Sequence, residues 1–170
     1  MSEKSDVQEP LLKYSQEIGW DCVKSADALK LRGGDRGLYF TEVLKKQLLK
    51  LNPKVLNEER ANTVIRQLNL LRPTIEDNQE ALRWMRGEYS VFVPEENRER
   101  NIRLIDFENP ENNVYHVTDE GRQQGVVYPN RADVVFLING VPVAIAETKS
   151  AGKLDGLAEG VEQIRRYHRE

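Results

Sequence analysis

The sequence predicts a mixed α/β or α+β domain with at least one antiparallel hairpin. Hydrophobic residues recur at helical spacing through most of residues 7–87, whereas short β-branched and aromatic runs between polar turns follow in residues 89–146. Residues 154–167 then return to helical spacing. Helices on either side of a run of strands are typical of a sheet covered by helices.

The composition is that of a single globular domain. Of the 170 residues, 39% are hydrophobic and 31% are charged, and Cys22 is the only cysteine. No apolar run reaches the roughly 18 residues of a membrane span, and the N-terminus lacks a signal-peptide core, so a reducing, cytoplasmic location without membrane contact is predicted. The net charge of −3 argues against general nucleic-acid affinity, which must come from a local patch or a partner domain.

Helices dominate the first half of the predicted fold. Asn57 and Thr74 are expected N-caps, because each precedes acidic residues and an apolar helical stripe. Residues 20–25 could form a short strand, and the glycines at 31–37 read as a turn-rich connector, since the Gly-Lys-Ser/Thr of a P-loop does not follow. The predicted helices are 7–18, 38–51, 57–71 and 74–87.

Strands dominate the second half. We expect them at 89–93, 102–107, 114–118, 134–138 and 141–146, the last two forming a hairpin around Asn139-Gly140. In the helix predicted for residues 154–167, the inward face should carry Leu154, Leu157, Val161 and Ile164.

The open end of the hairpin carries the candidate chemistry. Asp133 begins the first strand, and Glu147 and Lys149 follow the second. Each of these carboxylates on its own is typical of a solvated strand end. Together they repel unless a divalent cation lies between them, and hard oxygen ligands suit Mg²⁺ or Mn²⁺. Lys149 lies on the same side of its strand as Glu147, where an ammonium can hold a water or neutralise a phosphate.

This cation site places a condition on the hairpin register. A regular two-residue turn at Asn139-Gly140 would pair Asp133 with Ala146 and point Glu147 to the opposite face of the sheet. The carboxylates meet only if the loop has an odd length or a bulge shifts one strand. We therefore predict a three-residue loop, residues 138–140, with Gly140 in a left-handed conformation, or an equivalent bulge.

Two residues in the last helix extend this site. Gln163 and Tyr167 are four apart and share a helical face. The pattern Asp133, Glu147-Thr-Lys149 and Gln163-Ile-Arg-Arg-Tyr167 resembles the PD-(D/E)xK nuclease superfamily, in its RecB-like branch with a Gln-xxx-Tyr motif. Two longer segments resemble the N-terminal nuclease domain of type I restriction enzyme R subunits: DFENPENNVYHVTDE and RADVVFLINGVPVAIAETKSA. Ala132 stands where the superfamily usually has proline.

The resemblance implies a restriction-endonuclease-like core with a mixed central sheet flanked by helices. It implies one nuclease domain over residues 1–170, with an α-rich insertion at about 38–87 and a catalytic core of about 89–170 plus the helix at 7–18. Asp133 and Glu147 would be Mg²⁺ ligands, and Lys149 would activate the attacking water. Gln163 and Tyr167 would support the site. A first-helix glutamate, Glu9 or alternatively Glu17, would complete the metal site.

The implied activity is Mg²⁺-dependent endonucleolytic cleavage of double-stranded DNA in an ATP-dependent type I restriction-modification complex that defends against phage. ATP would serve only a translocase domain of the same subunit, which these residues do not contain, so we expect a fragment of a longer chain. Methyltransferase (M) and specificity (S) subunits would be partners. The alternatives are a stand-alone RecB-like repair or defence nuclease and an inactive DNA-binding or assembly module.

Basic residues near the motif offer a weak DNA contact. Acidic and basic residues balance over residues 131–170, and the basic ones could equally form ion pairs along the last helix with Asp155, Glu159 and Glu162. The candidate phosphate contacts are Arg131, Lys153, Arg165, Arg166 and Arg169.

Overall fold

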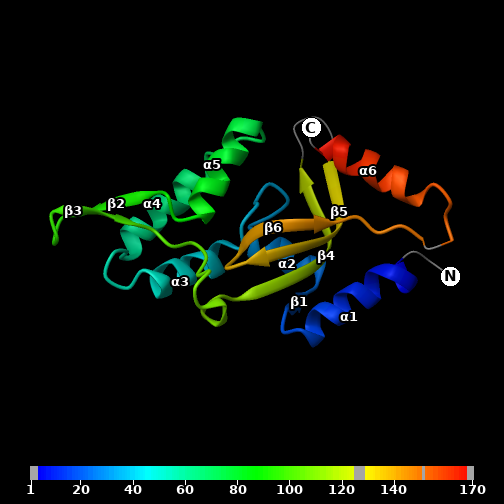
Figure 1. The fold of residues 1–170 in the computed structure, drawn as a ribbon, viewed down its shortest axis with the longest axis horizontal. Coiled ribbons are helices and arrows are strands. Elements are labelled where there is room, and N and C mark those ends of the chain that lie inside the picture. The colour runs from blue at the N-terminus through cyan, green and yellow to red at the C-terminus, as the bar shows by residue number, and fades with distance from the viewer. Residues whose placement is uncertain (1–3, 125–128, 151, 168–170) are drawn as a thin grey trace. The chain divides into compact units, whose positions relative to one another are not determined.

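The computed structural model describes residues 4–124, 129–150 and 152–167, and Figure 1 shows the helices and strands that they form. The helices are η1 (Lys4–Gln8, a π-helical turn), α1 (Glu9–Glu17), α2 (Ser25–Leu31), α3 (Thr41–Leu51), α4 (Glu58–Asn69), α5 (Ile75–Met85), η2 (Pro110–Asn112, a 3-10 turn) and α6 (Gly156–Tyr167). The strands are β1 (Asp21–Val23), β2 (Ser90–Val93), β3 (Arg98–Asn101), β4 (Tyr115–Gln124), β5 (Pro129–Ile138) and β6 (Val141–Ala146). Within the described ranges, no helix is long and apolar enough to cross a membrane.

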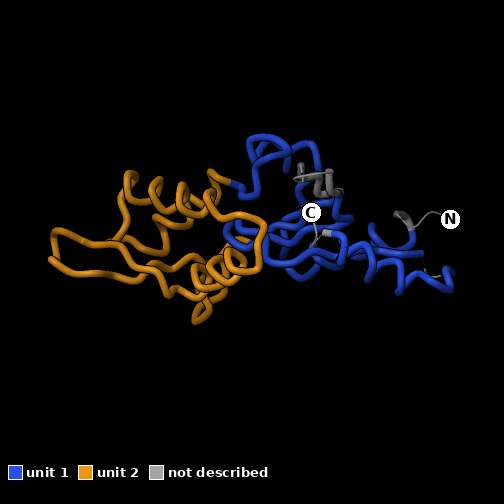
Figure 2. Tube along the Cα trace, turned by 90° about the horizontal axis from the view of Figure 1, so that it is seen from above, with its two compact units in different colours: residues 1–40, 115–170 blue, residues 41–114 orange. Residues whose placement is uncertain are grey.

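The chain divides into two compact units, coloured separately in Figure 2. Unit 1 combines the N-terminal segment, Met1–Phe40, with the C-terminal segment, Tyr115–Glu170. Unit 2 is the continuous segment Thr41–Val114, which contains α3 to α5 and the hairpin of β2 and β3. The strands β2 and β3 therefore belong with the helices and not with the sheet of unit 1.

A four-stranded mixed sheet forms the centre of unit 1, in the order β1-β4-β5-β6 (Figure 1). β1 is parallel to β4, whereas β4, β5 and β6 pair in antiparallel fashion. α1 packs against β1 and β4, and α2 packs against β4. The predicted α/β fold with a mixed sheet flanked by helices is confirmed.

Both faces of this sheet are covered by side chains. On one face, the Trp20 ring lies 5.1 Å from the rings of Tyr115 and Phe136. On the other, Phe40 packs against His116 at 5.6 Å between ring centroids. Burial lowers the pKa of His116 below its ordinary value. Side chains packed on both faces of β4 help to hold this part of the sheet in place, which suits it to carry a site at a strand end.

The first helices of unit 1 show what local signals predict and what they miss. α1 fulfils the helix predicted at 7–18, and Gly19 ends it with φ +95°, a conformation that favours glycine. β1 confirms the short strand considered for residues 20–25. Helix α2 was not predicted. Its first backbone N–H, that of Ser25, donates to Asp119 Oδ1 at 3.0 Å, so a cap 94 residues away begins this helix.

In unit 2, the three predicted helices are confirmed as α3, α4 and α5. Asn57 caps α4 by accepting a hydrogen bond from the backbone N–H of Arg60 at 2.9 Å. Thr74 caps α5 by accepting from the N–H of Asp77 at 3.1 Å. These caps are local, three residues from donor to acceptor, and the sequence pattern therefore reveals them.

The strand predicted at residues 102–107 is wrong. The partner of β2 is β3, Arg98–Asn101, which immediately precedes that segment. Residues 102–107 form an irregular buried stretch because side chains replace the ladder bonds. Asn52 bonds both the N–H and the carbonyl of Arg103, and Asn113 bonds the N–H and carbonyl of Asp106. The β-like composition of this stretch thus reflects burial and not strand pairing.

Candidate active site

The register of the β5–β6 hairpin decides whether the two motif carboxylates can lie opposite each other. Its turn is a two-residue loop, with φ 53° at Asn139 and φ 81° at Gly140, and not the three-residue loop expected. A register shift lies further along: Leu137 pairs with Pro142 but Phe136 pairs with Ala144. The required bulge is therefore present, in β6 and not in the turn.

The bulge leaves Val143 as the extra residue of β6. It follows Pro142, which has no N–H to donate and is tolerated at a bulge in an edge strand. Val134 then pairs with Ala146. Continuing this register by one residue would set Asp133 opposite Glu147, whereas β6 itself ends at Ala146.

Asp133 is held by contacts at both its side chain and its backbone. Its Oδ2 accepts hydrogen bonds from the backbone N–H of Thr148 at 2.7 Å and from the Thr148 hydroxyl at 3.0 Å. Its carbonyl oxygen accepts from Nε2 of Gln8 at 2.8 Å. The site thus joins β5, the end of β6 and the N-terminal helix.

Glu147 and Lys149 lie side by side in a largely buried environment. The Glu147 side chain is 1% exposed and that of Lys149 is 17% exposed, and Nζ lies 3.9 Å from Glu147 Oε2. The same Nζ donates to Oε1 of Gln163 at 2.9 Å. Opposite charges at this separation attract strongly where water is scarce. The structure thus brings Glu147, Lys149 and Gln163 together, and Asp133 joins the same strand end through its hydrogen bonds with Thr148.

Helix α6 approaches Lys149 through glycine and not through the predicted apolar stripe. A Cβ built on Gly156 would lie 3.2 Å from Cβ of Lys149, and one on Gly160 would lie 3.8 Å from its Cγ. Leu154 and Leu157 are instead 102% and 85% exposed. The predicted inward face was wrong because two glycines one helical turn apart allow closer approach than leucines do. The Gly-xxx-Gly spacing was the signal that could have revealed it.

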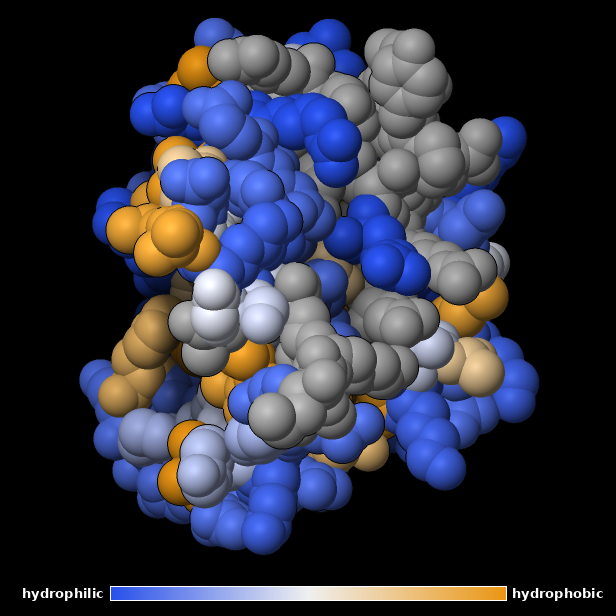
Figure 3. Space-filling view, turned by 90° about the vertical axis from the view of Figure 1, so that its right-hand side faces the viewer, coloured by the Kyte–Doolittle hydropathy of each residue, from blue (hydrophilic) through white to orange (hydrophobic). Residues whose placement is uncertain are grey.

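The coloured residues on the face shown in Figure 3 form no single broad apolar surface. That face is mostly hydrophilic, and the hydrophobic side chains visible on it gather in separate small groups.

The remaining predicted site residues are Glu9 or Glu17 in the first helix and Tyr167 in the last helix. Glu9 and Glu17 are both exposed, and the part of the chain that the structure describes contains no group of three acidic, histidine or cysteine side chains placed to hold a metal ion. The first-helix side chain that reaches Asp133 is Gln8, which sequence reasoning missed. Tyr167 ends α6, but its side chain lies outside the described residues.

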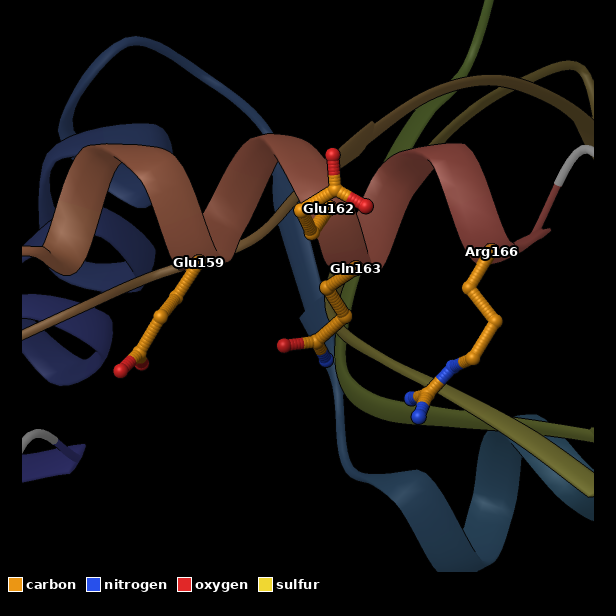
Figure 4. A pocket seen from close by; sticks show the side chains of 4 residues that line it. All are labelled: Glu159, Glu162, Gln163 and Arg166. Carbon is orange, nitrogen blue, oxygen red and sulfur yellow. The ribbon is translucent and has the colours of Figure 1, made fainter.

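Beside these groups, α6 borders a pocket of about 370 Å³ that is lined by Glu159, Glu162, Gln163 and Arg166. Figure 4 shows Glu159, Gln163 and Arg166 extending from the same side of the helix, with the carboxylate of Glu162 turned away from them. Gln163 therefore faces both Lys149 and this pocket.

Two of the candidate basic residues near the motif are engaged in ion pairs. Lys153 pairs with Glu159 at 2.6 Å and Arg165 pairs with Glu162 at 2.7 Å, as the ion-pair interpretation predicted. Arg166 is exposed at the pocket and makes no ion pair within the described ranges. Arg131 is exposed on β5, and Arg169 lies outside the described residues. The local patch that could contact a phosphate is thus small.

A mixed sheet flanked by helices, with acidic residues and a lysine at the end of a hairpin of that sheet, is the arrangement of a restriction-endonuclease-like domain. The chain belongs to the family described as type I restriction enzyme R protein N terminus, whose model matches residues 1–170.

Individual relatives carry the same description. The chain is 24% identical over 163 residues to the type I restriction enzyme HindI endonuclease subunit of Haemophilus influenzae, covering 88% of this chain and 15% of that protein. It is 37% identical over 79 residues to the EcoprrI endonuclease subunit of Escherichia coli, covering 46% and 24%. A relative from Methanocaldococcus jannaschii, also named among type I endonuclease subunits, is 36% identical over 77 residues, covering 45% and 7%. The chain spans less than a quarter of the length of these relatives.

Proposed function

We propose that this domain is the Mg²⁺-dependent endonuclease of a type I restriction enzyme R subunit, and that it hydrolyses phosphodiester bonds of double-stranded DNA. The observation that carries the proposal is the bulge in β6, whose register would set Asp133 opposite Glu147 if continued by one residue, together with the largely buried Lys149 that lies beside Glu147. Membership of the R-subunit family supports it independently.

The donor set fits a hard divalent cation. Asp133 and Glu147 offer carboxylate oxygens near the open end of one hairpin, and no thiolate or imidazole that would favour zinc lies among the residues assigned to the site. Mg²⁺, or Mn²⁺ in its place, would be held by these two carboxylates together with the backbone carbonyl near Thr148. When bound, it would lower the pKa of a water and stabilise the charge that develops on the scissile phosphate.

The chain's own residues then supply orientation and charge. Lys149 is fixed between Glu147 and Gln163, so its ammonium is positioned to hold the attacking water or to neutralise a phosphate oxygen. Glu147 places a negative charge 3.9 Å from that ammonium, which helps to hold the lysine side chain in this position. Gln163 holds the lysine in place through Oε1 and faces the pocket, where a DNA strand would lie.

Affinity for DNA would come largely from elsewhere in the enzyme. Two of the basic residues beside the site are engaged in ion pairs, and the formal net charge of the chain is −3. Phosphate contacts provide most of the affinity of a DNA-binding protein, and this chain offers few of them. We infer that an ATP-driven translocase domain of the same subunit, with the methyltransferase and specificity subunits, delivers DNA to this domain.

Replacing Glu147 by glutamine tests the proposal. The variant keeps the side-chain shape but loses the charge that would bind Mg²⁺ and that faces Lys149, so plasmid cleavage by the assembled enzyme with ATP and Mg²⁺ should fall about 10²-fold. The matched control is Glu111→Gln on the exposed turn η2, which should cut at the wild-type rate. Wild-type cleavage by Glu147→Gln would contradict the assignment of this site.

The glycines of α6 provide a second test. Gly156→Ala would crowd the Lys149 stem at 3.2 Å and displace its ammonium, so we expect cleavage to fall about tenfold, because small misplacements of a catalytic group are costly. Gly160→Ala makes only ordinary contact at 3.8 Å, and should leave cleavage unchanged while raising helix stability by about 0.5–1 kcal/mol. Initial cleavage rates and thermal melting of both variants measure this, and equal rates would contradict it.

A further inference from the structure

Asp133 accepts hydrogen bonds at both its side-chain carboxylate and its backbone carbonyl. The Thr148 N–H and hydroxyl both donate to the same oxygen, Oδ2, at 2.7 and 3.0 Å. Gln8 donates to the backbone carbonyl of Asp133 at 2.8 Å from a position 125 residues away in sequence. Thr148 and Gln8 are both 5% exposed, so water competes little for these bonds.

Two donors on Oδ2 decide which oxygen remains for a cation. A carboxylate oxygen has two lone-pair directions, and Thr148 supplies a donor for each. Oδ1 is therefore the oxygen of Asp133 that can face a cation opposite Glu147. The hydroxyl of Thr148 fixes the rotation of the carboxylate, and the N–H ties it to the end of β6.

Gln8 contacts the backbone of Asp133 and not its side chain, and this contact needs the NH₂ donor of an amide. Its NH₂ group donates to a carbonyl, and an ionised glutamate at the same place would set a carboxylate against that carbonyl. The bond ties the N-terminal helix to the backbone of β5 at Asp133 itself. It therefore limits movement of the Asp133 main chain, just as Thr148 limits movement of its side chain.

We propose that Thr148 and Gln8 are positioning residues that fix Asp133 as a ligand through one oxygen, Oδ1, of the bound divalent cation. The inference rests on the proposed function, because it assumes a cation between Asp133 and Glu147. Hydrogen-bonding partners of metal ligands typically contribute 10- to 100-fold to metal affinity. Neither residue needs to touch the cation for this effect.

Binding of Mn²⁺ to the chain, measured by calorimetry, tests the role of Thr148. Thr148→Val keeps the shape and the N–H but removes the hydroxyl, and should weaken Mn²⁺ binding about tenfold. Thr148→Ser restores the hydroxyl and should bind Mn²⁺ within about twofold of wild type. A serine variant as weak as the valine variant would overturn the proposal, because the methyl group and not the hydroxyl would then matter.

The role of Gln8 has its own pair of variants. Gln8→Met has similar length but no donor, and we expect about tenfold weaker Mn²⁺ binding. Gln16→Met makes the same change at an exposed position of α1 and should bind Mn²⁺ as wild type does. Circular dichroism melting checks that each variant is folded. Wild-type affinity in both Thr148→Val and Gln8→Met would overturn the proposal.

The same measurement separates this inference from the proposed function. If Asp133→Asn loses Mn²⁺ binding while Thr148→Val and Gln8→Met retain it, the cation site stands and the positioning role is wrong. If Asp133→Asn binds Mn²⁺ as tightly as wild type, the cation site itself is wrong and the inference fails with it.

Discussion

Replacing Asp133 by asparagine is expected to lower DNA cleavage by the assembled enzyme about 10³-fold, equivalent to about 4 kcal/mol of lost transition-state stabilisation. The asparagine would direct its carbonyl oxygen at the two donors of Thr148, which now bond Oδ2. Its NH₂ group would then face the cation position, where it offers hydrogens and no lone pair. Both the charge and the ligand atom would be lost at once.

The plasmid-cleavage assay for Asp133→Asn needs a control for assembly. ATP hydrolysis by the same preparation should stay at the wild-type rate, since the proposed translocase domain would be separate from this site. Asp35→Asn, in the exposed connector before Phe40, is the matched substitution and should cut DNA normally. Retention of cleavage above about a tenth of the wild-type rate in Asp133→Asn would show that this carboxylate is not a metal ligand.

Replacing Lys149 by methionine should lower cleavage about 10²- to 10³-fold by a different route. Methionine fills the space that the lysine stem occupies beside Gly156 and Gly160, but it loses the ammonium that contacts Glu147 and Gln163. Removal of one charged group that stabilises a transition state has an effect of this size. Cleavage under single-turnover conditions measures the chemical step directly.

Cation binding distinguishes the two variants. Lys149→Met removes a positive charge near the cation, so Mn²⁺ should bind at least as tightly as in wild type, whereas Asp133→Asn should lose Mn²⁺. Lys153→Met, on the exposed loop before α6, serves as the control and should cut at the wild-type rate. Loss of Mn²⁺ binding in Lys149→Met would assign the lysine a structural role in place of a catalytic one.

Local chemistry accounts for the features that the sequence predicts well. The caps Asn57 and Thr74 each bond a donor three residues away, so the pattern contains both partners. The alternation of side chains between the two faces of a β-strand is equally local. From this alternation and the positions of Asp133 and Glu147 in the sequence, a bulge could be predicted as the condition for the two side chains to share a face. Where that bulge would lie was not local, because it depended on how β6 pairs beside Pro142.

Features that depend on distant partners were missed. Residues 102–107 look like a strand, but Asn52, 51 residues before Arg103, bonds their backbone. Helix α2 begins at a donor bonded to Asp119. The face of α6 that packs inward depends on how closely Gly156 and Gly160 approach Lys149, and hydrophobicity alone predicted a neighbouring face.

By itself, the sequence determined the candidate residues Asp133, Glu147, Lys149 and Gln163, because they follow from strand and helix periodicity and from a family pattern. Only the tertiary structure decided what holds Asp133 in place. The bond from Gln8 crosses 125 residues, and no spacing within the chain predicts which side chain of the first helix reaches the hairpin. Periodicity places a residue on a face, but the packing of helix against sheet decides what that face touches.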